Sequence, residues 1–454
     1  MKLVPFDETA QYVDAMRATR PLLNPILGPV YGIIGHDALD DSGIVGKISL
    51  LVSQPLDKVF DLITPSSHLE VKRRNLTIVP AGGKGDEWGA AIGGGIGEYI
   101  ERYYASLAFF EDLKRGRIVY ASPQELRARG MEVLGPERLL LFASEQYKDK
   151  DFPFARFTEE SWIGWVKAHY LLSGKEIYIP SFLVYMAYRA HSQESIIGYP
   201  TSGGLSFRPT RDEAIFHGIL ELVERDAVNL FWISRIPAIR LSLEAITCSS
   251  LSPFLGDTAA LYVLLLQTDM APFVVHCSFF NERRPIFLGG GSADFNLREA
   301  IRKALLELKQ TAYSAQFTTH RVRDKRELMD FFLVIPYYSE PRRMKGLRKQ
   351  MMRLIAEVQP FHLVEREIPP PSTPKELARV LNLDPIVYEF DLAALGWSLP
   401  GSLVRVVLPE LTLPGVPLWP FLGHPRYYHS SYLWGITAQP LTYGQLNREP
   451  LPFP

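Results

Sequence analysis

The segment that most constrains the fold of this chain lies near its centre, between Glu213 and Ala227. Its apolar residues recur at spacings of three and four, which predicts an α-helix that ends at about Ser234. At about 100° per residue, Glu213, Glu224 and Glu221 stand at about 0°, 20° and 80°, so three carboxylates share one face. Because the rest of the helix is apolar, we expect it to be buried.

Three carboxylates on one face of a buried helix repel one another and lose hydration, so they need cations or paired bases to remain ionised. Two interpretations meet that need: an ion-pair network with Lys and Arg, or a metal site. The crowding of Glu213, Glu221 and Glu224 favours the metal site. Carboxylate oxygens suit Mg²⁺, which usually keeps waters and bridges to nucleotide phosphates.

A second helix, expected from about Glu87 to Asp112, adds two carboxylates three residues apart, Glu98 and Glu101. Before it lies a glycine-rich segment, 82–85, predicted to be a loop whose backbone amides and Lys84 ammonium would suit phosphate. Four glycines inside the helix permit close approach of a neighbour or a ligand. The structural alternatives are a surface acidic pair and tight helix packing. Those glycines are Gly93, Gly94, Gly95 and Gly97.

A third helix is expected from Leu297 to Phe317. A base on this helix could neutralise a transferring phosphate. The alternative is a surface ion pair between Lys303 and Glu307, which are four residues apart. The candidate nucleotide-binding residues on it are Arg302, Lys303, Glu307 and Gln310.

The composition narrows the classes of function. The 454 residues include 49 basic and 50 acidic ones, so no global field recruits nucleic acid or an anionic membrane. Two cysteines, Cys248 and Cys277, form no CxxC or Cys/His zinc pattern and allow at most one disulfide, which fits a reducing cytoplasm. The N-terminus lacks a secretory apolar region, and the longest apolar run, 259–266, is too short to span a bilayer. We therefore expect a cytoplasmic protein.

Strand and helix signals alternate irregularly, which predicts an α+β fold with mixed sheets and long helices. Strands are expected over 47–52, 162–166, 176–188, 261–266, 273–280, 386–392 and 403–408. Segment 123–157 is expected to be irregular and 201–207 a loop.

These segments resemble the YcaO family. Residues 83–85 followed by GEYIERYYAS (97–106) resemble its first signature, and TSGGLSFRPTRDEAIFHGILELVERDA (201–227) resembles its second. ALLELKQ (304–310) resembles the third, and RVVLPEL and GHPR, with Arg405 and Arg426, resemble the C-terminal block. The resemblance implies a YcaO-type ATP-binding domain over 20–454, preceded by an N-terminal extension, 1–19.

The resemblance also assigns roles. Family glutamates hold Mg²⁺ on the phosphates of ATP, and Lys84, Ser206 and Arg225 stand at positions expected to contact nucleotide. Two positions depart from the family pattern: Gly203 replaces an asparagine, and Lys303 stands where arginine is usual. The positions that correspond to the metal-binding glutamates are Glu98, Glu101, Glu213, Glu221 and Glu224.

The alternating prolines Pro450, Pro452 and Pro454 favour an extended segment that loses little entropy on ordering. Such a PxPxP segment resembles that of azoline-forming members, where it reaches the active site, so the three prolines and Arg225 are assigned to catalysis. The alternative is a solvated, frayed terminus.

The implied chemistry is an ATP-dependent cyclodehydration of Cys, Ser or Thr residues in a ribosomally made precursor peptide, giving thiazolines or oxazolines. The implied partners are the precursor peptide, a leader-binding protein related to ubiquitin-activating enzymes, a flavin-dependent azoline dehydrogenase and a second copy of the chain. Alternatives are another YcaO chemistry, thioamide or amidine formation, and a non-catalytic nucleotide-binding scaffold. A toxin or antibiotic is the commonest product of the family.

Overall fold

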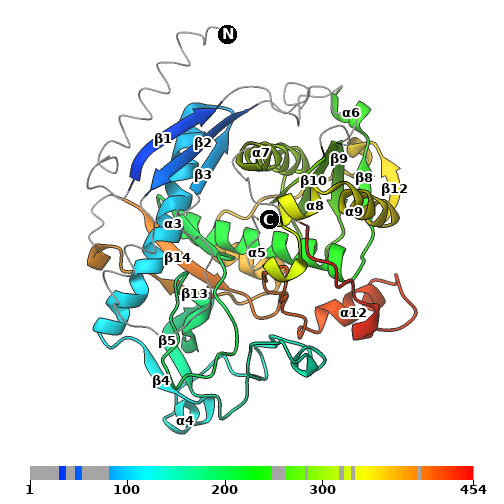
Figure 1. Ribbon diagram of the computed structural model, residues 1–454. Helices are drawn as coiled ribbons and strands as arrows, with labels where there is room; N and C mark the ends of the chain where they lie inside the picture. Colours follow the sequence, from blue (N-terminus) through cyan, green and yellow to red (C-terminus); the bar gives the residue numbers. More distant parts are fainter. Residues whose placement is uncertain are drawn as a thin grey trace.

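The computed structural model describes residues 30–36, 46–53, 81–247, 261–281, 285–315, 322–328, 333–395 and 400–452. Three sheets and three long helices dominate this part of the chain (Figure 1). The α+β prediction is confirmed. Among the described helices, none combines the length and apolar character needed to cross a membrane.

The first sheet is antiparallel, in the order β1-β2-β3. The second has the order β11-β10-β9-β8-β12, and in it only the edge pair β8–β12 is parallel. The third has the order β4-β5-β13-β14-β7, with β6 added to β5. The strands of these sheets are β1 (Val30–His36), β2 (Lys47–Ser53) and β3 (Ala81–Gly85); β8 (Ala238–Leu241), β9 (Leu261–Leu266), β10 (Phe273–Asn281), β11 (Ile286–Asp294) and β12 (Ile355–Gln359); and β4 (Val119–Ala121), β5 (Ile163–Tyr170), β6 (Glu176–Pro180), β7 (Leu205–Arg208), β13 (Ile386–Glu389) and β14 (Ser402–Val407).

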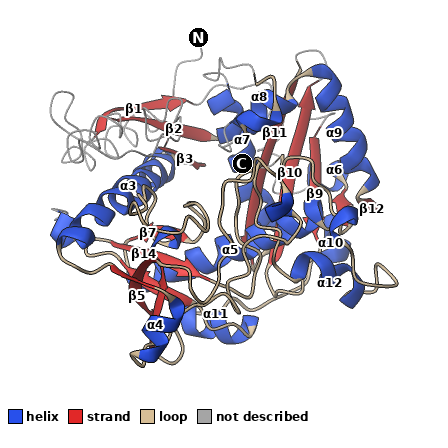
Figure 2. Cartoon of the chain, turned by 60° about the horizontal axis from the view of Figure 1, so that its bottom comes forward, coloured by secondary structure: helices blue, strands red, loops and turns tan. Residues whose placement is uncertain are grey.

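Helix α5 (Arg211–Ile233) lies between the second and third sheets, as Figure 2 shows. It packs on β14 and β7 on one side and on β11, β10 and β9 on the other. Because both sides face a sheet, the helix is apolar nearly all round and its C-terminal half is buried. Each buried Leu, Ile, Val or Phe side chain contributes roughly 1.5–3 kcal/mol.

The other two long helices complete the layers around α5. Helix α7 (Leu297–Ala315) covers the far face of the second sheet. Helix α3 (Trp88–Lys114) covers the far face of the third sheet with its C-terminal half and β2–β3 with its N-terminal half. Strand β3 also contacts α7. Strand β3 therefore lies between α3 and α7 and links the two outer layers.

The remaining helices are short, except for α9, which packs on edge strand β12. They are α4 (Pro123–Ala128), α6 (Leu243–Thr247), α8 (Val334–Tyr338), α9 (Pro341–Arg353), α10 (Phe361–Val364), α11 (Pro374–Leu381) and α12 (Arg426–Leu433).

Several sequence predictions need correction. The glycine-rich segment 82–85 is not a loop but most of strand β3. Residues 205–208 form a strand, β7, and the strand predicted over 176–188 ends at Pro180, where a 3₁₀ turn begins. Short helix α4 occupies the start of segment 123–157, which we expected to be irregular. The boundary predicted between residues 19 and 20 lies outside the described residues.

Glycine permits the close contact between β3 and α3. A Cβ atom on Gly83 would overlap the carbonyl oxygen of Ala91, and one on Gly95 would lie 2.6 Å from Ser49 Oγ. By contrast, a Cβ on Gly93 would meet nothing within 4 Å. The glycines of α3 therefore divide into a packed face and an open face.

We expect Gly83→Ala to lower the free energy of unfolding by about 3 kcal/mol, at the upper end of overpacking effects, because backbone atoms block the added methyl. The matched control is Gly93→Ala. It should raise stability by about 0.5–1 kcal/mol, since alanine loses less backbone entropy in a helix. Urea unfolding measures both, and equal effects of the two substitutions would contradict this packing.

Candidate functional site

Two carboxylates of α3 are oriented by backbone N–H groups of two different strands. The N–H of Gly82, in β3, donates to Glu98 Oε2 at 2.7 Å, and the N–H of Phe207, in β7, donates to Glu101 Oε1 at 2.7 Å. Arg102 contacts Glu98 Oε1 at 2.5 Å, and Arg208 lies 3.6 Å from Glu101 Oε1. Both carboxylates are therefore held in one orientation where α3 meets β3 and β7.

Two carboxylates of α5 lie near this pair. Glu221 Oε2 accepts a hydrogen bond from Gly204 N, at 3.2 Å, just before β7. Glu224 lies against β11, where a Cβ on Gly291 would come within 2.6 Å of its Oε1. Glu221 and Glu98 are both close enough to Glu101 to act on its ionisation. We call Glu98, Glu101, Glu221 and Glu224 the carboxylate cluster.

Burial has the largest effect on the pKa of three members of the cluster, Glu101, Glu221 and Glu224. Burial raises the pKa of Glu101 to about 8, although Arg208 and the Phe207 N–H act in the opposite direction. Burial also raises the pKa of Glu221 and of Glu224, against the effect of Arg225. At Glu101, Glu221 and Glu224 the effect of burial on the pKa thus outweighs that of the neighbouring cations.

Two basic residues border the cluster. Burial lowers the pKa of Lys84 to about 8, and Glu224 and Glu98 partly offset that effect. The Lys84 ammonium forms an ion pair with Glu307 of α7. Arg225 acts on the ionisation of Glu221, Glu224 and Lys84, so it lies among them. Lys84 and Arg225 are therefore, with Arg102 and Arg208, cations that lie beside the cluster.

The donor set suits Mg²⁺. The cluster offers only oxygen donors, which a hard divalent cation prefers. Within the described residues, no three carboxylate, imidazole or thiol groups converge on one metal position. The buried hydroxyl of Ser206, next to Phe207, has no hydrogen-bond partner among the described residues. The two carboxylate pairs, one on α3 and one on α5, fit cations that are bound jointly by protein oxygens and by a ligand with its own oxygens.

The structure gives Glu213 a different place from the other predicted metal ligands. It lies exposed in the first turn of α5, and its Oε2 accepts from the N–H and hydroxyl of Thr210, at 3.1 and 2.9 Å. These bonds form a capping box, a standard helix N-terminus. Glu213 lies about two helical turns from Glu221. Through its bonds to Thr210 it caps the helix that carries the cluster.

The residues predicted on α7 to bind nucleotide are paired with neighbouring side chains and backbone, and Lys303 acts on the ionisation of His217 together with Lys84 and Arg208. Arg302 pairs with Asp86 and Glu299 at 2.8 and 2.9 Å, and Lys303 pairs with Asp294 at 2.6 Å. Gln310 Nε2 donates to Gly82 O at 3.0 Å, so it fastens α7 to the strand that orients Glu98.

The proline segment is buried as far as the structure describes it. Pro450 and Pro452 are both buried, and Pro454 lies outside the described residues. Tyr338 of α8 donates from its hydroxyl to Pro450 O at 2.6 Å, and Trp232 Nε1 of α5 donates to Glu449 O at 3.0 Å. In Figure 1 the segment after α12 runs from the rim of the molecule to its centre. It is therefore not a frayed, solvated terminus over 446–452.

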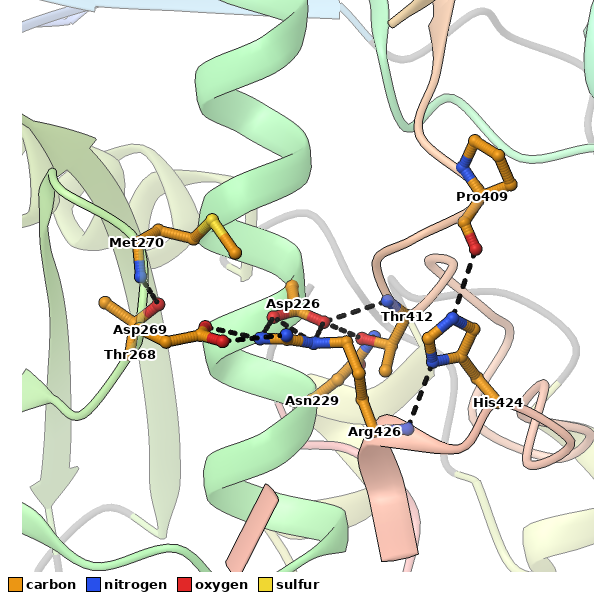
Figure 3. A network of polar contacts seen from close by, with 9 residues as sticks. All are labelled: Asp226, Asn229, Thr268, Asp269, Met270, Pro409, Thr412, His424 and Arg426. Atoms are coloured by element: carbon orange, nitrogen blue, oxygen red, sulfur yellow. Dashed lines mark hydrogen bonds and ion pairs between the residues drawn. The ribbon is translucent and has the colours of Figure 1, made fainter. Parts of the chain in front are cut away.

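A second polar network fastens the C-terminal part of the chain to α5 (Figure 3). Asp226, fully buried, accepts from Thr412 N at 2.8 Å and from Arg426 Nη2 at 2.7 Å, and Arg426 also pairs with Asp269 at 2.7 Å. His424 Nε2 donates to Pro409 O and its Nδ1 accepts from Arg426 N, at 3.1 and 3.2 Å. Burial lowers the pKa of His424, in keeping with this neutral form.

Sequence reasoning missed two participants, Arg208 and Gly291. Arg208 was inside the second signature but received no role. Alternation in β7 places it on the same face as Ser206, a signal that was available once β7 is recognised as a strand. Gly291 gave no signal, because its role depends on the position of Glu224 in space.

The match to a family model decides the family. The model described as YcaO cyclodehydratase, ATP- and Mg²⁺-binding, matches residues 82–411, well over half of the 454 residues. The chain belongs to the YcaO family. The resemblance read from the sequence is confirmed, and so are the predicted cofactors, ATP and Mg²⁺, which are those that the family model names.

Solved structures share the YcaO fold. A heterocyclase in complex with substrate and cofactor superposes with a TM-score of 0.73 and 19% identity, over 98% of this chain and 57% of that one. YcaO from Methanopyrus kandleri, bound with AMPPCP and Mg²⁺, superposes with a TM-score of 0.56 and 18% identity, over 89% of this chain and 91% of that one. A chain of the Escherichia coli microcin synthetase McbBCD complex superposes with a TM-score of 0.59 and 16% identity, over 95% of this chain and 99% of that one.

An uncharacterised protein of Methanothermobacter thermautotrophicus is 28% identical over 185 residues, which is 39% of this YcaO chain and 45% of that protein. This chain therefore spans less than half of that relative and 57% of the heterocyclase.

The raised pKa of Glu101 predicts how stability depends on pH without Mg²⁺. The group titrates near 4.5 when unfolded and at about 8 when folded, so its contribution to stability is present below pH 4.5 and is lost as the pH rises to about 8. Glu101→Gln cannot ionise, so its stability should increase relative to the parent protein over that range.

Thermal unfolding of both proteins between pH 4.5 and about 8 measures this difference. Added Mg²⁺ should stabilise the parent more at the upper end, since it binds the ionised carboxylate. A difference between the two proteins that does not change with pH would contradict the prediction.

Proposed function

We propose that this chain catalyses ATP-dependent cyclodehydration of Cys, Ser or Thr residues in a ribosomally made peptide, giving thiazolines or oxazolines. The observation that carries the proposal is the carboxylate cluster: two pairs, on α3 and α5, of which Glu98, Glu101 and Glu221 are oriented by backbone N–H groups. Such a set suits the Mg²⁺ ions of a bound nucleotide, and the family model names the same cofactors.

In this proposal Glu98, Glu101, Glu221 and Glu224 hold Mg²⁺, which supplies neutralisation of charge on the phosphoryl group during its transfer. Lys84, Ser206 and Arg225 are proposed to contact the nucleotide. Arg225 lies among the carboxylates and is proposed to stabilise the phosphoryl group during transfer. Glu307 and Gln310 hold Lys84 and Gly82 in place from α7.

The substrate reaction balances as follows. The side-chain thiol or hydroxyl of the substrate residue loses its proton to solvent as its sulfur or oxygen attacks the preceding backbone carbonyl carbon. The former carbonyl oxygen takes the γ-phosphoryl group of ATP, which leaves ADP. The C–O bond then breaks, phosphate departs, and the amide nitrogen loses its proton to form the C=N bond of the ring. One water is thus removed from the peptide, and its oxygen leaves in phosphate.

The proline segment supports azoline formation among the YcaO chemistries. Its backbone is anchored at Glu449 and Pro450 by Trp232 and Tyr338. An extended proline segment advances about 3 Å per residue. Trp232, which anchors the segment, lies eight residues from Glu224 along α5, a rise of about 12 Å. We propose that Pro450, Pro452 and Pro454 position the reacting peptide.

We further propose that the chain works with the precursor peptide, a leader-binding protein related to ubiquitin-activating enzymes and a flavin-dependent dehydrogenase, in the cytoplasm and as a homodimer. The similarity in fold to a component of a synthetase complex, McbBCD, supports the expectation of protein partners.

Mass spectrometry of a candidate precursor peptide tests the function. The peptide is incubated with this protein, its leader-binding partner, ATP and Mg²⁺. We expect loss of one water mass per modified Cys, Ser or Thr, and no loss without ATP. A replacement of oxygen by sulfur with a sulfur donor would assign thioamide formation instead. An unmodified peptide, despite tight ATP binding, would favour a scaffold subunit.

The role of the proline segment predicts a separation of two activities. Removal of residues 450–454 should abolish ring formation and leave ATP binding nearly unchanged, because the cluster lies on α3 and α5. Tyr338→Phe, which removes one hydrogen bond to Pro450 O, should lower the rate of ring formation in the same way but less.

Peptide mass spectrometry and ATP titration measure the two effects. The matched control is Tyr337→Phe, since the adjacent Tyr337 ring stacks with Arg343 and its hydroxyl makes no hydrogen bond to residues 446–452. Normal ring formation by the truncated protein would refute a role for the segment.

A further inference from the structure

Arg405 is a fully buried cation in the middle of the third sheet. It lies in β14, paired with Leu205 of β7 and Tyr388 of β13, and is only 1% exposed. Within the part of the chain that the structure describes, its hydrogen bonds all end on backbone carbonyls: Gly203 O at 2.6 Å, and Val184 O at 3.1 and 3.3 Å. A guanidinium so deep in a sheet is costly, so its retention calls for a role beyond packing.

The bond to Gly203 O connects Arg405 to the carboxylate cluster. That oxygen belongs to the peptide group between Gly203 and Gly204. The N–H of the same peptide group donates to Glu221 Oε2 at 3.2 Å. One rigid peptide plane therefore accepts from Arg405 at one end and donates to Glu221 at the other.

The surroundings fix this peptide in place. Gly204 has φ +76°, a conformation that favours glycine, and its own carbonyl oxygen accepts from Val406 N at 2.8 Å. A Cβ on Gly203 would overlap the ring of Pro414. Pro414 thus leaves room only for glycine here, which accounts for the departure from the asparagine of the family pattern.

We infer that Arg405 is a positioning residue for Glu221, acting through the Gly203–Gly204 peptide, which it holds with the N–H directed at the carboxylate. The inference rests on the proposed function of the cluster. A charge-assisted bond to the carbonyl polarises the peptide and strengthens the bond that its N–H makes. If the peptide turned over, its carbonyl oxygen would face Glu221, and two acceptors would repel each other.

The Gly203–Gly204 peptide borders a small cavity next to Arg405. A cavity of about 20 Å³ is lined by Gly203, Arg405, Leu222 and Pro414, among others. Removal of the Arg405 side chain head would enlarge it. The cost would then appear at Glu221, one of the proposed Mg²⁺ ligands, rather than in the sheet alone.

The test is a Mg²⁺ titration of ATP binding, followed by calorimetry, on the full chain and on Arg405→Met and Arg405→Lys. We expect Arg405→Met to raise the Mg²⁺ concentration for half-maximal binding by about 10–100-fold, the usual effect of losing a residue that orients a metal ligand. Arg405→Lys keeps the charge and one donor, so it should restore part of the affinity.

A purely structural role predicts a different result. Val387→Ala is the matched control, because Val387 is fully buried in the neighbouring strand β13, next to Tyr388, the partner of Arg405 in the sheet. It should lower the melting temperature and leave the Mg²⁺ requirement unchanged. If both Arg405 variants bind with the Mg²⁺ requirement of the parent, whatever their melting temperatures, the inference is wrong.

Two further outcomes keep the test decisive. If Arg405→Met does not fold, Arg405→Lys alone decides: a raised Mg²⁺ requirement supports the inference and an unchanged one refutes it. If the unaltered chain binds no ATP at any Mg²⁺ concentration, the proposed function itself is wrong. If the unaltered chain and both variants bind ATP with the same Mg²⁺ requirement, only the inference about Arg405 is wrong.

Discussion

The structure depends on one electrostatic constraint, the confinement of like charges where α3 and α5 meet strands β3, β7 and β11. Helix α5 must be apolar to lie between two sheets, yet it carries Glu221 and Glu224 toward β7 and β11. Each carboxylate that loses water must gain donors. The surrounding backbone supplies them from β3, β7 and the turn before β7, and so the positions of these strands and of the cluster determine one another. The remaining charge is left for a ligand to neutralise.

Much of this arrangement was predictable because it follows from patterns of residues that are close in sequence. The periodicity of the segments that begin at Glu213 and Leu297 predicted α5 and α7. Two pairs of glutamates, each three residues apart, predicted all four members of the cluster. Glu213 shows the limit of a helical projection. The angle places it on the face of Glu221, but the projection omits the axial distance, about 12 Å over eight residues. Glu213 also follows Thr210 by three positions, the spacing of a capping box, and that local signal was overlooked.

Other features depend on partners remote in sequence. The segment 82–85 has the composition of a loop, but β2 on one side and α3 on the other make it a strand whose glycines permit contact. Gly203 seemed only a departure from a family pattern until Pro414, more than two hundred residues later, showed why no side chain fits there. Arg405 stands in an apolar strand pattern, and its link to Glu221 runs through a peptide bond that no pattern of side chains reveals.

The network around Asp226 has a consequence for the order in which the chain is made. Asp226 is fully buried, and its partners Thr412 and Arg426 come 186 and 200 residues later. At about 5–20 residues per second, a ribosome needs about 10–40 s to add them. Throughout that interval α5 has emerged with a carboxylate that cannot be buried without cost. The central helix therefore cannot reach its final packing until the C-terminal block is synthesised, and a nascent chain lacks a finished site.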